Sequence, residues 1–67
     1  MAQEMHPFRV KGHGMRFGKD ETGYFEEGTQ AVSEKKAIQN VLYHKKRDMG
    51  LNPNTKMEFE GTVDRLD

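Results

Sequence analysis

The sequence contains no cysteine, no tryptophan and no long hydrophobic run. Without cysteine the chain can form neither a disulfide nor a thiolate metal site, and we expect a protein of the reducing cytoplasm. No apolar stretch approaches the roughly 20 residues that a membrane-spanning helix needs. The first seven residues lack the basic and apolar regions of a signal peptide, so the sequence predicts neither a membrane partner nor secretion.

An excess of either charge is also missing, because eleven Lys and Arg residues balance eleven Asp and Glu residues. This neutrality argues against binding nucleic acid through bulk electrostatic attraction. The charges are nevertheless grouped, with basic blocks at 1–19 and 33–53 and acidic blocks at 20–32 and 54–67. Local contact with phosphates therefore stays compatible with the sequence.

Apolar residues are scarce as well, since only 33% of the 67 residues are hydrophobic. That composition indicates one small domain. A core of this size supplies about 3–5 kcal/mol of stability. With no disulfide to add to it, we expect stability to come from packing, or from a protein partner or a second copy of the chain.

The first half of the chain has the pattern of an antiparallel hairpin. We expect residues 1–7 to form a flexible leader, and the first strand to start at Phe8, where apolar and basic residues alternate. Residues 18–21 form a turn signal, and 22–32 are predicted as the second strand.

The end of the first strand is ambiguous. Phe8 and Val10 occupy even positions, whereas Met15 and Phe17, which follow Gly12-His13-Gly14, occupy odd ones. A β-bulge at the glycines would re-aim the side chains in this way. Alternatively, the strand ends before the glycines, and Met15 and Phe17 lie in a loop.

A helix is predicted over 34–48. Ser33 precedes it as a capping residue, and Glu34 suits the positive end of the helix dipole. Cations gather in its last turn, and Gly50 suits the left-handed position that follows a helix. The apolar residues that recur with the helical period are Ala37, Ile38, Val41 and Leu42.

Residues 56–66 alternate strictly and predict a third strand. The inward positions are Met57, Phe59, Gly61 and Val63, and the outward positions are Glu58, Glu60, Thr62 and Asp64. The element order is thus ββαβ, an α+β fold in a single domain over 8–67. A right-handed crossover places the third strand beside the first. We predict a three-stranded antiparallel sheet in the order 2-1-3, with one face covered by the single helix and the other open.

Six features follow one another along the chain: Phe8-Arg9-Val10-Lys11-Gly12, a strand ending in Ala31, Ser33-Glu34-Lys35-Lys36-Ala37, a helix reaching Tyr43, Leu51, and Lys56-Met57-Glu58-Phe59-Glu60. This order resembles the LX-type family of archaeal large-subunit ribosomal proteins over about residues 8–63. The resemblance implies the ββαβ fold and association with RNA or the ribosome. The family is basic and has a Gly-Ser-Lys-His turn where this neutral chain reads Lys46-Arg47-Asp48-Met49-Gly50. The element order is also similar to that of a small phage inhibitor of bacterial RNA polymerase, which implies protein binding.

No group of residues has the pattern of a catalytic or metal site. His6, His13 and His44 lack the spacing of metal ligands. Acid–base catalysis needs carboxylates in a desolvated cleft, for which a one-helix sheet has little room. We therefore predict no enzyme, no metal, no cofactor and no small-molecule substrate.

Basic residues are the first candidates for function, because those of the helix can follow the phosphates of RNA. Two basic residues of the first strand join them if that strand faces the same way. The predicted nucleic-acid-binding residues are Arg9, Lys11, Lys35, Lys36, Lys45, Lys46 and Arg47. The alternative for the helix is an ordinary amphipathic helix whose lysines compensate its dipole.

Residues that do not fit the core pattern are the second candidates. Met15, Phe17, Tyr24 and Tyr43 are predicted to form a patch that contacts a partner or stacks on RNA bases. The alternative is that they are single exposed apolar residues, which are normal on protein surfaces. The first functional hypothesis is a non-catalytic module associated with RNA or the ribosome through the basic helix face. The alternative is a protein-interaction module of phage or mobile-element type that acts through these four residues and the open face or edge of the sheet.

Overall fold

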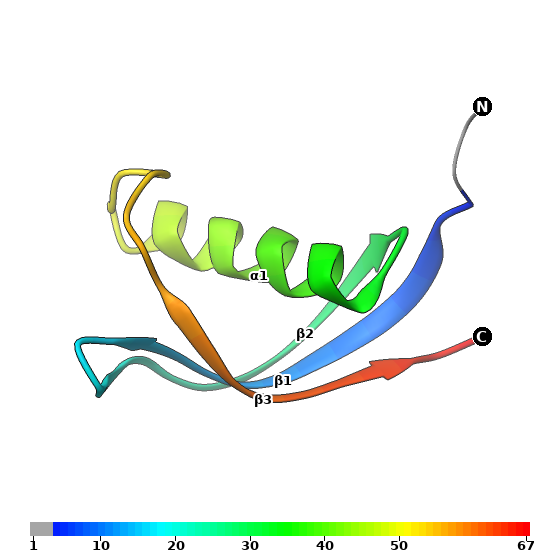
Figure 1. Cartoon of the computed structure of the whole chain (residues 1–67), viewed down its shortest axis with the longest axis horizontal. Coiled ribbons are helices and arrows are strands. Elements are labelled where there is room, and N and C mark those ends of the chain that lie inside the picture. The colour runs from blue at the N-terminus through cyan, green and yellow to red at the C-terminus, as the bar shows by residue number, and fades with distance from the viewer. Residues whose placement is uncertain (1–3) are drawn as a thin grey trace.

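A computed structural model describes residues 4–67 of the chain and contains three strands and one helix. The elements are β1 (His6–Arg16), β2 (Lys19–Ala31), α1 (Glu34–Asp48) and β3 (Glu58–Arg65). The strands form an antiparallel sheet in the order β2-β1-β3. The helix lies over one face of this sheet, as Figure 1 shows. The predicted ββαβ fold and the strand order 2-1-3 are confirmed.

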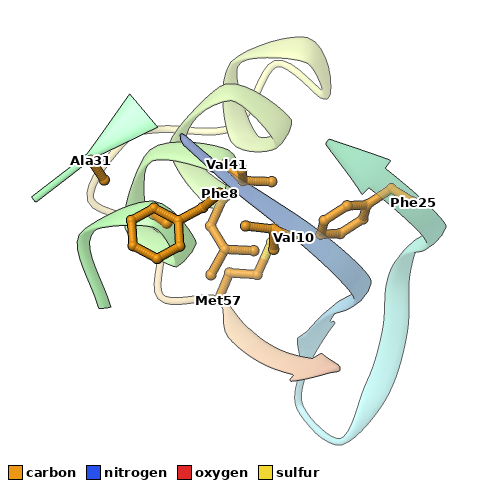
Figure 2. Close-up of a cluster of buried hydrophobic side chains, with 8 residues drawn as sticks. Phe8, Val10, Phe25, Ala31, Val41 and Met57 are labelled. Atoms are coloured by element: carbon orange, nitrogen blue, oxygen red, sulfur yellow. The ribbon is translucent and has the colours of Figure 1, made fainter. Parts of the chain in front are cut away.

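The core lies between the helix and the even-numbered side chains of β1. Val10 is fully buried, and Figure 2 shows side chains from β1, β2, the helix and the loop before β3 converging around it. The buried side chains are Phe8, Val10, Phe25, Ala31, Ala37, Val41, Leu42 and Met57. Eight residues make a small core, and the uncovered face of the sheet contributes nothing to it.

The helix has the predicted bounds because both of its ends carry local signals. The Ser33 hydroxyl accepts a hydrogen bond from the Lys36 N–H at 3.3 Å, which satisfies one of the free donors of the first turn. Gly50 follows the helix with φ of 73°, a conformation that glycine adopts without strain. In the part of the chain that the structure describes, no helix is long and apolar enough to cross a membrane.

The strand bounds differ from the predicted ones. β1 starts at His6, so the expected leader is wrong for His6 and Pro7, while its first three residues lie outside the described part. The reason is tertiary: His6 pairs with Ala31, and the Leu66 N–H donates to the Pro7 carbonyl at 2.9 Å. β2 starts earlier than predicted, at Lys19, and β3 is shorter, because Met57 leaves the sheet for the core.

The predicted bulge is present, but its extra residues lie in β2. The pairing of the two strands shifts between His13 and Met15; across this step β1 contributes Gly14 alone and β2 contributes 21–23. β1 runs on to Arg16 with its even residues still facing the helix, so the loop alternative and the predicted switch of side-chain parity are wrong. Met15 consequently lies on the open face of the sheet.

Hydrogen bonds from the bulged segment show why β2 takes the extra residues. The Gly14 N–H donates to Thr22 Oγ1 at 2.9 Å, in place of a backbone partner. The Gly23 N–H donates to Asp20 Oδ1 at 2.9 Å, and Gly23 has φ of 75°. A glycine and two short polar side chains are what a bulge of this kind requires.

The backbones of β1 and β3 come unusually close where Gly12 faces Gly61. A Cβ atom on Gly12 would lie 2.2 Å from the Glu60 carbonyl oxygen, and one on Gly61 would lie 2.0 Å from the Lys11 carbonyl oxygen. Only glycine fits at either position. Beyond this contact β1 continues to the β1–β2 turn, which lies at the opposite end of the molecule from the C-terminus (Figure 1).

Candidate functional site

The structure does not bring the predicted nucleic-acid-binding residues together. Arg9 and Lys11 alternate with the buried Phe8 and Val10. Successive side chains of a strand point to opposite faces, so these two cations lie on the open face of the sheet. The helical lysines and Arg47 lie on the other side of the molecule.

Two of the helical cations are engaged within the fold. Lys45 Nζ lies 2.8 Å from Glu27 Oε1 and 5.0 Å from the centre of the Phe25 ring. Lys46 Nζ donates to the carbonyls of Pro53 and Thr55, both at 3.1 Å, and so holds the loop that follows the helix. Neither ammonium group is free to follow a phosphate backbone.

The other helical candidates are spread over the outer side of the helix. Lys35, Lys36 and Arg47 are exposed and form no ion pair among residues 4–67. Tyr43 is 43% exposed and packs edge-on against His44, with ring centres 6.0 Å apart. Lys35 and Lys36 lie in the first turn of the helix and Arg47 lies in the last, so these cations do not form one continuous basic patch.

The open face of the sheet is polar. Lys11 Nζ lies 4.0 Å from Glu26 Oε1, and His13 Nδ1 lies 2.9 Å from Asp20 Oδ2. Tyr24 is 62% exposed on this face, and its ring meets the edge of His13 at 5.7 Å between ring centres. Because side chains of opposite charge interleave across the strands, this face needs no apolar cover.

The hydroxyl of Tyr24 takes part in the same polar network. It donates to Glu26 Oε1 at 3.1 Å. Partial desolvation, this hydrogen bond and the nearby charge of Glu26 raise the pKa of Tyr24 above its ordinary value. The phenol is thus a neutral hydrogen-bond donor at physiological pH.

The most unusual residue of the chain is Phe17, at the tip of the β1–β2 hairpin. Arg16 pairs with Lys19, so the loop between them has only two residues. Their φ angles are 53° at Phe17 and 74° at Gly18, which defines a type I′ turn. Turns of this type strongly prefer Asn-Gly, since an L residue with a side chain is strained at positive φ.

Phe17 is also the most exposed large apolar side chain in the described residues, at 92%. It is the one residue other than glycine with positive φ between positions 4 and 67. Neither burial in the core nor the local preference of the turn accounts for a phenylalanine here.

A shallow groove of about 190 Å³ opens beside the hairpin tip. It is lined by Met15, Arg16, Phe17, Gly18, Lys56 and Glu58. The guanidinium carbon of Arg16 lies 5.5 Å from the centre of the Phe17 ring, and its Nη1 lies 3.1 Å from Glu21 Oε1. An aromatic ring, a thioether and charges of both signs therefore meet at one end of the molecule.

The structure brings together two of the four predicted partner-binding residues, Met15 and Phe17. Tyr24 lies farther along the open face, and Tyr43 lies on the helix. Sequence reasoning missed Lys56 and Glu58, which enter the groove only because β3 pairs beside β1. The signal that the sequence did contain is Phe-Gly at a two-residue turn, where Asn-Gly is the usual pair.

The described residues contain no arrangement suited to a metal centre. Among the residues that the structure describes, no group of three or more His, Asp or Glu side chains is placed to hold a metal ion. No polar or charged side chain is buried between positions 4 and 67.

Comparison of the chain with protein-family models, with curated proteins and with solved structures finds no match. The resemblance to LX-type ribosomal proteins therefore stays a prediction, and function must be argued from the residues themselves.

Proposed function

We propose that this chain is a small non-catalytic protein-binding module whose hairpin tip carries the binding anchor, Phe17. One observation carries the proposal: Phe17 adopts a strained backbone and buries almost none of its ring. A non-glycine residue in the left-handed region costs about 1–2 kcal/mol. In a domain with so small a core, that cost is offset if the ring is buried in a partner.

The surroundings of Phe17 favour a protein over RNA as that partner. Arg16 is already paired with Glu21, and Glu58 lines the same groove, so the tip does not present the uniform positive charge that phosphates require. Aromatic and arginine side chains are, in contrast, the commonest hot-spot residues of protein interfaces. Binding by RNA, which the ribosomal resemblance implies, becomes one of the outcomes of the test. The action of the module in the cytoplasm is part of the proposal, supported by the cysteine-free sequence.

The test is affinity capture with three forms of the chain: wild type, Phe17→Asn and Tyr43→Asn. Asparagine suits the turn, so the first variant keeps the fold while it removes the ring, and the second removes an aromatic side chain on the other side of the molecule. We expect one set of proteins to be retained by the wild type and Tyr43→Asn and lost with Phe17→Asn. The association of that set is then measured with purified components.

Two results would contradict the proposal. Equal capture by Phe17→Asn and wild type would show that the tip is not the anchor. Loss of the captured material on ribonuclease treatment, with an affinity that falls steeply as salt is raised, would assign the chain to RNA instead.

A further inference from the structure

We infer that the partner presents an extended basic segment, which adds as a fourth strand to the free edge of β3 and places an apolar side chain in the groove beside Phe17. The inference rests on the proposed function and names the kind of partner that the same site accepts. It depends on three observations: an open strand edge, its continuity with the groove, and a row of carboxylates that form no ion pair.

The outer edge of β3 is open. Within residues 4–67, β3 pairs with β1 alone, so every second residue of Glu58–Arg65 directs its backbone N–H and C=O away from the sheet. The exposed residues of the strand are Glu58, Glu60, Gly61, Thr62, Asp64 and Arg65. An added strand would satisfy these backbone groups, as in other cases of strand addition.

This edge leads directly into the groove at the hairpin tip. Glu58, the first residue of β3, faces Met15 across the sheet and lines the groove, together with Lys56 just before it. A segment lying along β3 therefore arrives at Phe17 at that end. Eight residues of strand span about 26 Å, which is enough for a peptide of similar length.

The carboxylates of β3 specify the charge of the segment. Glu58, Glu60 and Asp64 are exposed on the open face and form no ion pair within the described chain. On β1, His13 faces Glu60 but pairs with Asp20 of β2, and the residue that faces Glu58 is the uncharged Met15. Arg9 faces Asp64 without forming an ion pair with it, so Glu58 and Glu60 are the carboxylates with no cation opposite them. Lysine or arginine side chains at alternate positions of an added strand would face the row on β3, an arrangement that stabilises cross-strand pairs.

A second copy of the chain fits this edge poorly. In an antiparallel pairing of two β3 strands centred on Gly61, with both helices on the same side of the joined sheet, Glu58 of each copy would lie directly opposite Asp64 of the other. Like charges directly opposite one another are destabilising. The other edge of the sheet is a worse platform, because the bulge at 21–23 interrupts β2. The charge pattern therefore selects a basic partner at β3.

The test uses ten-residue capped peptides in which lysine and threonine alternate and leucine occupies one end, in both orders, with matched peptides that carry glutamate in place of lysine. Affinities are measured by fluorescence anisotropy, and contacts are located by amide shifts in NMR spectra of the full chain. We expect the lysine peptide to bind and to shift the amides of 58–65 and of Phe17 and Gly18. We expect the glutamate peptide not to bind.

Variants of the chain separate strand addition from the tip anchor. Glu60→Lys turns an attractive pair into a repulsive one and should weaken the lysine peptide about 2- to 30-fold. Asp48→Lys, which makes the same charge change at the exposed end of the helix, should leave the affinity unchanged. Phe17→Asn should weaken the leucine-ended peptides and leave a peptide without leucine unaffected.

The inference is overturned if no lysine peptide binds, if Glu60→Lys and Asp48→Lys have equal effects, or if the amide shifts fall on β2. It is likewise overturned if the leucine-ended peptides shift the amides of the tip alone, in which case the proposed anchor stands without strand addition. A Phe17→Asn variant that captures all partners of the wild type would instead refute the proposed function, whatever the peptides do.

Discussion

The turn at Phe17 can be tested directly, because two substitutions that remove the same ring should differ in stability, with asparagine the more stable. Phe17→Asn provides the residue that a type I′ turn prefers, whereas Phe17→Ala leaves a side chain at positive φ. Both remove a ring that is 92% exposed. The difference between the variants therefore isolates the backbone contribution.

The expected magnitudes follow from the geometry. Removing an aromatic side chain that buries less than a tenth of its area lowers the stability of the protein by about 0.5 kcal/mol. Loss of the contact with the Arg16 guanidinium, 5.5 Å from the ring centre, costs about 0.5–1 kcal/mol at an exposed site. Relief of the left-handed strain returns about 1–2 kcal/mol in the asparagine variant only. Phe17→Asn should lie between about 0.5 kcal/mol less stable and about 1 kcal/mol more stable than the wild type, and Phe17→Ala should be about 1–1.5 kcal/mol less stable.

The assay is urea denaturation followed by circular dichroism. Since about 1 kcal/mol shifts the melting temperature of a domain of this size by about 4–8 °C, thermal melts give a second measure. The control is Tyr24, an exposed aromatic at ordinary φ, where asparagine should be no better than alanine. If Phe17→Asn is no more stable than Phe17→Ala, the turn stores no strain, and the argument that Phe17 serves a partner loses its basis.

Three further predictions concern the fold. Gly12→Ala should destabilise the chain by at least about 2 kcal/mol and leave it largely unfolded by circular dichroism, because the new Cβ would meet a backbone oxygen at 2.2 Å; a native spectrum with an unchanged urea midpoint would contradict this. Lys45→Gln removes the ion pair with Glu27 and the cation over an aromatic ring, and should cost about 1 kcal/mol in urea denaturation, less at high salt; no loss would mean that solvent screens the pair. Hydrogen bonds from His6 and then Arg65 hold the pKa of Asp67 below its usual 3.8, so the stability that Asp67 contributes is complete above that pH and is lost as the pH falls. The melting temperatures of Asp67→Asn and wild type should therefore differ at pH 7 and converge in acid. A difference that stays constant with pH would show that the ionisation of Asp67 is not coupled to folding.

The helix was predictable because its signals are local. The Ser33 cap, the period of its apolar residues and Gly50 all act within one or two turns, so the bounds 34–48 need no information from the sheet. The strict alternation after Met57 predicted β3 in the same way. The strand order followed from chain connectivity, since a right-handed crossover leaves β3 a place beside β1.

The candidate site was only half predictable. Phe17 and Met15 stood out because they broke the core pattern, but Lys56 and Glu58 are about forty residues away in the sequence and join them only through the pairing of β3 with β1. The basic residues were misleading for a related reason. Composition counts Lys45 and Lys46 as free cations, whereas the fold places a carboxylate and two carbonyls against them.

By itself, the sequence determined the ββαβ order, the limits of the helix and the small size of the core, because periodicity, capping and composition are properties of short segments. The tertiary structure decided which strand carries the bulge. That depends on two hydrogen bonds, in which Thr22 accepts from the Gly14 N–H of the opposite strand and Asp20 accepts from the Gly23 N–H of its own strand. It also decided that Arg9 and Lys11 lie across the sheet from the helical cations. Most of all, it decided that Phe17 stands strained and exposed at the tip, because the φ of a turn is set by the two strands that it joins.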